Sequence, residues 1–461
     1  MGNSLQVVLI STYELGRQPF GLASPAAWLR REGATVTCLD LSKQSLRAET
    51  IRSADLVAFY LPMHTATRIA VVAIERIKTL NPEAHLCCYG LYAPMNADYL
   101  RGVGVQTLLG GEFEEGLVGL MRRLRRATRP VEESGQTEPT ISLQKQKFLV
   151  PEREGLLPLG HYARLRTGDG ERRTVGYTEA SRGCLHLCRH CPVVPVYNGQ
   201  FRIVQPEVVL EDIRRQVAGG AEHITFGDPD FFNGPGHSLA IVEKLHEEHQ
   251  NLTYDVTIKI EHLLKYSRHL PTLRDTGCLF VTSAVESVDD RVLELLAKHH
   301  TREDFFEVVR RFRQTRLTLA PTFVAFTPWT SLEGYGKLLS DLLELDLVEN
   351  VAPIQLAIRL LIPSGSKLLE LSETWSFVQG FDQAALSYRW QHPDPRVDRL
   401  QADVLKRVKE GEAEGASRRK IFTSIWERVG EEAGTDLRDP RLSQVPLPRA
   451  AIPYMDEPWY C

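Results

Sequence analysis

Three cysteines lie close together in one stretch of the sequence, SRGCLHLCRHCPVVPVYNGQFR. Cys184, Cys188 and Cys191 offer three thiolate ligands on a single loop. A closed zinc site needs a fourth cysteine or histidine at tetrahedral distance. His186 and His190 lie inside the stretch, but zinc ligands usually come as two separated pairs, and no second pair is visible. The other interpretation is a 4Fe–4S cluster held by three thiolates, with one iron left for a ligand that is not protein.

The elements before this loop predict a Rossmann-like domain in residues 1–128. Apolar strands are expected at VVLIS, TVTCLDL, LVAFYLP and LCCYGLY, and they alternate with amphipathic helices, the first starting at Ser24-Pro25. Buried strands joined by helices are typical of a doubly wound parallel sheet. Ligands of such sheets lie at the carboxyl ends of the strands, where ELGRQPFG, PMHTA, YAPMN and GGEFEE should gather.

The rest of the chain predicts an α/β barrel followed by a helical region. Residues 129–160 include a polar stretch rich in Pro, Ser and Thr, which indicates a linker. Within residues 161–373, six strand–helix units fit a partial (β/α)6 barrel, the last strand being VAPIQLAIRLLIP. Residues 374–461 are expected to be mainly helical and to end in a cysteine-bearing tail.

The CxxxCxxC spacing, on the loop after the first barrel strand, resembles that of the radical S-adenosylmethionine (SAM) superfamily. The resemblance implies that Cys184, Cys188 and Cys191 bind a 4Fe–4S cluster. Its open iron would chelate the amino and carboxylate groups of SAM, and reductive cleavage would commonly yield a 5′-deoxyadenosyl radical. The radical SAM barrel would be the catalytic core.

Further strand ends match this family. GDPD at residues 227–230 varies the glycine-rich turn that meets the amino group of SAM, and SAVES at residues 283–287 resembles Gly-x-Glu-Ser. His190 replaces the usual aromatic residue and would stack near the adenine. Ordinary strand-end turns remain the alternative for each match. The resemblance places these residues at SAM: Gly227, Asp228, Pro229, Glu286, Ser287 and His190.

Two arginines flank the cysteines. Positive charge from Arg182 and Arg189 would stabilise the reduced form of a cluster. The alternative is that both are solvated loop residues.

The first domain resembles that of cobalamin-binding radical SAM proteins, with GGEFEEG at residues 110–116. The loop after its first strand lacks the histidine that ligates cobalt from below, as it does in many radical SAM relatives. His64 is interpreted as incidental, and Cys87 and Cys88 as buried thiols. Two alternatives stay open: cobalamin binding, or a scaffold that caps the active site.

The tail PYMDEPWYC ends at Cys461. A terminal segment of this kind is usually frayed. Together with GCLHLCRHCPVVPVY, however, it resembles radical SAM proteins with a CUAEP or CCAEP tail. We therefore expect the gene to continue through a UGA codon as a selenoprotein. Cys461 would then be a catalytic residue, as a soft nucleophile or ligand over the barrel mouth.

The charge and the hydrophobicity of the sequence limit the classes of partner that we expect. The formal net charge of −4 gives no field that favours nucleic acid or a membrane surface. No apolar run reaches the roughly 18 residues of a membrane span, so a cytoplasmic location is expected. The expected partners are a small-molecule substrate and an electron donor such as flavodoxin or ferredoxin.

Two other functions stay open. Relatives in arsinothricin biosynthesis suggest transfer of a 3-amino-3-carboxypropyl group to a thiophilic substrate such as arsenite. A non-catalytic metal-binding or sensor protein is the alternative from another class.

Overall fold

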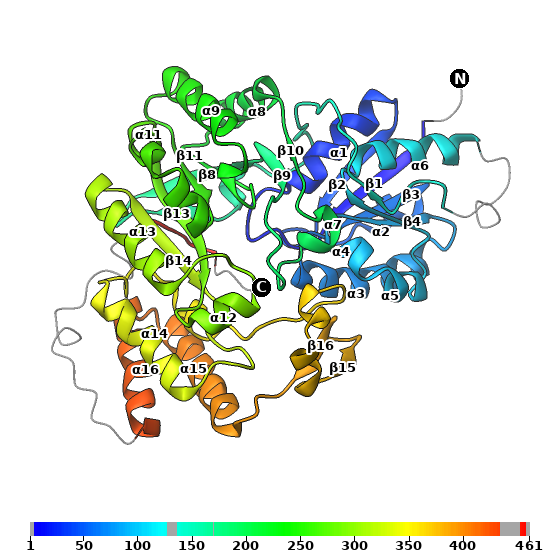
Figure 1. Ribbon diagram of the computed structural model, residues 1–461. Helices are drawn as coiled ribbons and strands as arrows, with labels where there is room; N and C mark the ends of the chain where they lie inside the picture. Colours follow the sequence, from blue (N-terminus) through cyan, green and yellow to red (C-terminus); the bar gives the residue numbers. More distant parts are fainter. Residues whose placement is uncertain (1–3, 127–135, 169, 434–451, 458–461) are drawn as a thin grey trace.

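The computed structural model describes residues 4–126, 136–168, 170–433 and 452–457. A first domain, blue to cyan in Figure 1, lies beside a second domain drawn in green. Helices coloured orange and red follow below the second domain. The expected α/β class and the division into a parallel sheet and a barrel-like sheet are confirmed.

The first domain is built on a six-stranded parallel sheet of order β2-β1-β3-β4-β5-β6. Its strands are β1 (Gln6–Ser11), β2 (Thr35–Asp40), β3 (Leu56–Tyr60), β4 (His85–Tyr89), β5 (Thr107–Gly111) and β6 (Ile141–Ser142). Its helices are α1 (Phe20–Arg31), α2 (Ala48–Arg52), α3 (His64–Leu80), α4 (Tyr92–Met95), α5 (Ala97–Gly102) and α6 (Glu114–Arg126). Strand β6 comes from the predicted linker and adds an edge to the sheet.

Alternate residues of each buried strand face opposite layers of helices. Val7 and Leu9 pack with α1 and α6, whereas Val8 and Ile10 pack with α2, α3 and α5. Both faces of the sheet are therefore covered, as expected for a doubly wound domain. Cys87 and Cys88 point to opposite faces and are fully buried, in agreement with the sequence interpretation.

Helix α1 begins earlier than the sequence predicts. It starts at Phe20, so Pro25 lies inside the helix. Proline has no N–H to donate to the carbonyl four residues back. That carbonyl belongs to Gly21, and the Tyr89 hydroxyl donates to it over 2.8 Å. A buried side chain thus replaces the missing backbone donor, which the local sequence does not reveal.

The second domain contains a curled seven-stranded sheet of order β14-β13-β12-β11-β8-β7-β17. Five strands are parallel: β8 (Arg172–Thr178), β11 (His223–Phe226), β12 (Thr253–Thr257), β13 (Cys278–Glu286) and β14 (Thr318–Phe323). Antiparallel β7 (Arg164–Arg166) and β17 (Tyr454–Met455) extend one edge. The helices between and around these strands are α8 (Pro206–Ala218), α9 (Pro235–Glu248), α10 (Ile260–Lys265), α11 (Leu270–Asp275), α12 (Asp290–Leu295), α13 (Arg302–Thr315) and α14 (Leu332–Glu344).

The prediction of a full sixth barrel strand is wrong. Residues 353–356 form a 3-10 turn, and beyond it one parallel bridge joins Phe326 to Arg359. The Arg359 side chain turns away to pair with Asp398 and to stack on Trp390. The apolar run is buried by packing under the C-terminal helices, so its hydrophobicity does not require a strand.

The C-terminal region is less purely helical than expected. Helices α15 (Pro395–Ala413) and α16 (Arg418–Ala433) are present, but β15 (Val378–Asp382) and β16 (Ser387–Trp390) form an antiparallel hairpin before them. The hairpin turn reaches the first domain, where the His64 ring bonds to the carbonyl of Ala385. His64 thus has a structural contact. Among the described helices, none combines the length and the apolar character that crossing a bilayer requires.

We expect Tyr89→Phe to destabilise the first domain by about 1–3 kcal/mol, because the carbonyl of Gly21 is left buried without a donor. Chemical denaturation followed by circular dichroism measures this loss. Tyr99→Phe is the control, since the structure gives no hydrogen bond of that hydroxyl in the described residues. Equal stability of the two variants would contradict the assignment.

Candidate functional site

The cysteine loop is framed by short elements after β8. Strand β9 (Ser181–Gly183) pairs antiparallel with β10 (Phe201–Ile203), and α7 (Val194–Tyr197) lies between them. The Cys184 amide donates to the carbonyl of Gln200, which fixes the start of the loop. The sulfur side of Cys184 and Cys191 packs against an apolar cluster. The members of that cluster are Val193, Val196, Tyr197, Leu91 and Leu143.

The spacing of the three sulfurs does not suit one ion. Around a single zinc, thiolates at about 2.3 Å from the metal stand less than about 4 Å apart. In the described residues, the triplet does not form a group whose ligand atoms all lie within 4.8 Å of one another. A cluster carries its thiolates on three different irons, so wider spacing is what it requires. The donor set, three thiols on one loop, fits a 4Fe–4S cluster.

One closer group does exist. Ligand atoms of Cys184, His186 and Asp230 lie within 4.8 Å of one another. However, His186 already contacts Asp230 through Nε2 at 3.1 Å and the ammonium of Lys259 through Nδ1 at 3.2 Å. An ammonium beside the ring disfavours a further cation. This group is therefore better described as a buried polar network, in which His262 Nδ1 also lies 2.8 Å from the Asp230 carboxylate.

The surrounding protein raises the pKa of two of the three cysteine thiols. Burial raises the pKa of Cys184 to about 12 and that of Cys191 to about 11, and the neighbouring cysteines raise both further. Without a metal, the thiols of Cys184 and Cys191 therefore favour the protonated form at neutral pH. Binding a cluster must release these protons, since the thiolate is the ligand.

A buried charge network lies directly behind the cysteines. The Glu286 carboxylate accepts from His190 Nε2 at 3.1 Å and from Lys298 Nζ at 3.3 Å. Burial pushes the pKa of Glu286 upward, but Lys298 and His190 outweigh it and hold the pKa at about 2. The ammonium of Lys298 also lowers the pKa of Cys191. Positive charge near the cysteines thus comes from Lys298.

Lys298 was not found from the sequence. It lies in the turn after α12, where Ala297 and His299 adopt left-handed backbone angles of φ +52° and +55°. This turn directs the lysine inward, to 3% exposure. Neither the AKHH sequence nor its helical surroundings indicate burial, so the signal is tertiary.

The residues expected at SAM have different surroundings. The Asp228 carboxylate accepts from the Ala180 amide at 2.9 Å and the Ser181 hydroxyl at 2.6 Å, which ties β11 to the turn before the cysteines. Its pKa is raised to about 7 by burial. The Ser287 hydroxyl accepts from the Asp289 amide. By contrast, His190 Nδ1 is buried and has no hydrogen-bond partner within the described chain.

A cavity of about 380 Å³ lies inside the half-barrel. Gly227 and Pro229 form part of its wall, beside threonines of four strands and the guanidinium of Arg17 from the first domain. The threonines are Thr225, Thr257, Thr282 and Thr322. Asp255 is held by Thr225 and by His223 at 2.9 Å, so the cavity is polar where the strands end. Its size suits a small ligand.

The tail reaches this same cavity. Residues 452–457 line it, and β17 pairs with β7 at the sheet edge. Asp456 accepts from the Arg164 amide at 2.7 Å. The side chain of Glu457 covers Gly16, whose φ is +70°. This part of the tail is bound. Cys461, the expected catalytic residue, lies outside the described residues.

Both interpretations of Arg182 are wrong. It is 7% exposed, so it is not a solvated loop residue. Its charge is balanced by Glu112, Glu114 and Glu179 at 3.4, 2.8 and 2.7 Å, so it is not a free charge for a cluster. Arg189 instead donates to the last carbonyls of α12 and anchors the cysteine loop there.

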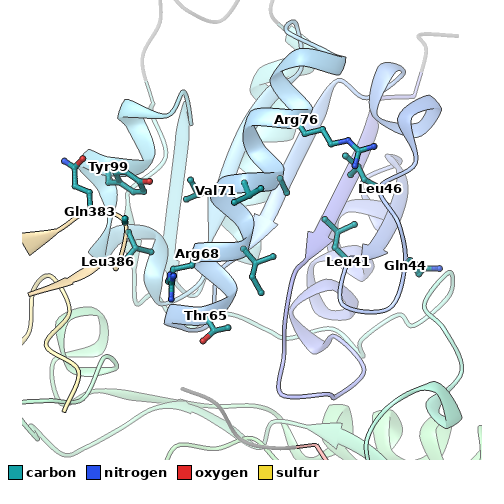
Figure 2. A pocket seen from close by; sticks show the side chains of 14 residues that line it. Leu41, Gln44, Leu46, Thr65, Arg68, Val71, Arg76, Tyr99, Gln383 and Leu386 are labelled. Carbon is teal, nitrogen blue, oxygen red and sulfur yellow. The ribbon is translucent and has the colours of Figure 1, made fainter. Parts of the chain in front are cut away.

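A surface hollow of about 800 Å³ lies elsewhere (Figure 2). It runs along α3, where Val71, Arg68 and Arg76 line it, and reaches the hairpin at Leu386. Val72 in its wall is 74% exposed, so the hollow is a surface groove and not an enclosed site.

Comparison with known proteins identifies the second domain. Residues 178–326 match the family model described as the Radical SAM superfamily. Over these residues the chain is similar to radical SAM domains. The match spans the cysteine loop and the strands from β11 to β14. Domains of this family use a 4Fe–4S cluster and SAM.

Two curated relatives extend the likeness. The chain is 25% identical over 325 residues to hopanoid C-3 methylase of Methylococcus capsulatus, and 27% identical over 191 residues to tRNA-2-methylthio-N(6)-dimethylallyladenosine synthase of Desulfosudis oleivorans. These matches cover 68% and 38% of the chain, and 62% and 38% of the relatives. The chain thus spans less than two thirds of either protein.

Solved structures share the fold over both domains. The radical SAM methyltransferase TsrM from Kitasatospora setae, with tryptophan and aza-SAM bound, superposes with a TM-score of 0.68 at 16% identity. That match covers 87% of this chain and 89% of TsrM. The cobalamin-dependent radical SAM enzyme OxsB, with aqua-cobalamin bound, gives 0.67 at 15% identity, covering 93% of this chain and 71% of OxsB.

Removing one partner of the buried pair should be costly. We expect Glu286→Gln to lower the free energy of unfolding of the cluster-free chain by about 3–5 kcal/mol, because the Lys298 ammonium stays buried without a carboxylate. The double variant with Lys298→Met should lose clearly less than the sum of the single losses. Denaturant unfolding measures all three.

Glu294→Gln is the matched control for that cycle, since its side chain is 74% exposed. Additive losses for Glu286→Gln and Lys298→Met would contradict a coupled pair behind the cysteines.

Proposed function

We propose that the chain cleaves SAM reductively and modifies a small molecule bound in the half-barrel, with Cys184, Cys188 and Cys191 as ligands of a 4Fe–4S cluster. The observation that carries the proposal is the triplet itself. Three thiols stand on one loop of a radical SAM domain, wider apart than one ion allows. A reduced cluster supplies the electron that breaks a carbon–sulfur bond of SAM.

The chain contributes binding groups around the cysteines. The free Nδ1 of His190 can donate to or accept from a ligand, while Glu286 and Lys298 fix its ring. Gly227 and Pro229 offer backbone at the cavity wall, and we propose that they meet SAM there. Asp228 acts as a positioning residue, since its carboxylate is already bonded. Ser287 keeps the turn after β13 in place.

The substrate would occupy the half-barrel cavity. Its threonines and Asp255 offer hydrogen bonds, and Arg17 offers a positive charge that no described carboxylate pairs. A volume of about 380 Å³ favours a small molecule over a macromolecule. Electrons would come from a protein such as flavodoxin or ferredoxin.

The names of two similar proteins, hopanoid C-3 methylase and the methyltransferase TsrM, support a methyltransferase-like reaction. A second candidate is 3-amino-3-carboxypropyl transfer to a thiophilic substrate such as arsenite. It is favoured by residues 452–457, which line the cavity and lead toward Cys461. In that case the chain would belong with the CUAEP or CCAEP group, and Cys461 would act on the substrate.

Replacing any cysteine of the triplet by alanine should abolish stable cluster binding, because two thiolates cannot hold the cluster in water. Iron and sulfide content after anaerobic reconstitution measures this. Cys278→Ala is the matched control, because Cys278 is a buried free thiol like Cys188 but lies in β13 away from the loop. Wild-type iron content in a triplet variant would contradict the ligand assignment.

SAM cleavage identifies the bond that breaks. The reduced wild-type protein should convert SAM to 5′-deoxyadenosine, or to 5′-methylthioadenosine if the second candidate holds. Liquid chromatography with mass spectrometry distinguishes the two nucleosides. Formation of neither by reduced, fully loaded protein would contradict SAM cleavage altogether.

A further inference from the structure

The carboxyl edge of the first sheet is the place where a doubly wound domain binds its ligand. Here that edge faces the radical SAM domain, and the space left between them is about 160 Å³. Residues from both domains line it, including Tyr60, Phe113 and Gly90 on one side and Tyr177 and Gly227 on the other. Sites for drug-sized ligands hold about 300–1,000 Å³. Cobalamin is larger than such ligands.

Aromatic side chains take up the room at this edge. The rings of Tyr60, Tyr89 and Phe113 contact one another, with centroids 4.9 to 5.9 Å apart. A methyl group added at Gly21 would collide with the Tyr60 ring, so the start of α1 lies directly against it. At Gly90 an added methyl group would lie 2.8 Å from the carbonyl of Leu61. The loops after β3 and β4 are thus closed on each other.

Charges lock the two domains across the same edge. Arg182 of the radical SAM domain pairs with Glu114 at 2.8 Å and with Glu112 at 3.4 Å, both from the first domain. The carboxylates are held in turn by Ser24 at 2.6 Å and by the Tyr197 hydroxyl at 3.1 Å.

The guanidinium of Arg182 also lies 5.3 Å from the Phe113 ring centroid. All these charged groups are buried. Separating the domains would leave them without partners, which is costly.

The two further hollows do not offer a substitute. The groove of Figure 2 runs along the open side of α3 and exposes Val72. The half-barrel cavity adjoins this space at Gly227 and Pro229, and the first domain contributes Leu15 and Arg17 to its wall. At about 380 Å³ it is also small for cobalamin. In this conformation the residues of the first domain therefore do not fit cobalamin, although OxsB shares the fold and holds it.

We infer that the carboxyl edge of the first domain is a closed joint, locked by Arg182 with Glu112 and Glu114, and that the chain works without cobalamin. The glutamates of the GGEFEE turn hold the neighbouring domain in place of a ligand. The inference stands apart from the proposed reaction, since the joint exists whether or not SAM is cleaved.

The test uses the full-length chain after anaerobic cluster reconstitution. The protein is incubated with excess hydroxocobalamin and desalted, and the retained corrin is measured by visible absorption against serum albumin treated in the same way. We expect no corrin above the albumin background, and the same rate of SAM cleavage with and without it. One equivalent of retained corrin, or cleavage that requires it, would overturn the inference.

Hydrogen–deuterium exchange tests the joint itself. In the wild-type chain, peptides covering residues 110–116 and 181–183 should exchange slowly, and added hydroxocobalamin should change neither. Glu114→Gln should speed exchange in both peptides, while Glu115→Gln, at an exposed neighbouring position, should not. Protection that appears only with hydroxocobalamin, or a Glu114→Gln variant that exchanges like Glu115→Gln, would contradict a locked joint.

Discussion

Three cysteine thiols on one loop are the feature around which the candidate site is built. Cys184, Cys188 and Cys191 stand on one loop, too far apart as a set to close around one ion. Contacts from other elements hold the loop in place. Arg189 anchors it to the end of α12, and the β9–β10 hairpin fixes its two ends. Ser366 donates to the carbonyl of Arg189 at 3.0 Å and braces the loop from the far side.

The charged groups next to the cysteine loop help to explain why the loop is stable there. Burial raises the pKa of the Cys184 and Cys191 thiols, and the ammonium of Lys298 acts in the opposite direction on Cys191. Glu286 holds that ammonium in place and also orients His190. One ion pair thus positions both a cation near the sulfurs and an imidazole with a free nitrogen. In a similar way, the single buried guanidinium of Arg182 joins the first domain to the barrel.

The elements that the sequence predicted well are those set by local patterns. Buried strands β1 to β4 and the helices α8, α9, α13, α14, α15 and α16 follow from continuous or periodic apolar residues. The cysteine triplet is legible because its spacing is local. Errors arise where tertiary contacts decide. Pro25 is tolerated inside α1 because Tyr89 supplies a donor, and the apolar residues before Arg359 are buried without becoming a strand.

The same reason explains what was missed at the site. Lys298 belongs to no recognisable motif. Its side chain reaches the site only because the residues on both sides of it adopt left-handed backbone angles. Arg182 was noticed for its distance from the cysteines along the chain, but its partners lie about 70 residues away in another domain. Pairings over such separations cannot be read from a single sequence, since no local pattern encodes them.

The proposed cleavage of SAM requires an iron site that the protein leaves free for SAM. Electron–nuclear double resonance of the reduced protein, with SAM labelled by a nitrogen isotope at its amino group, tests this most directly. A coupling between the cluster spin and the labelled nitrogen, absent with unlabelled SAM, is the predicted result. A cluster signal without that coupling, in protein shown by equilibrium dialysis to have bound SAM, would contradict it.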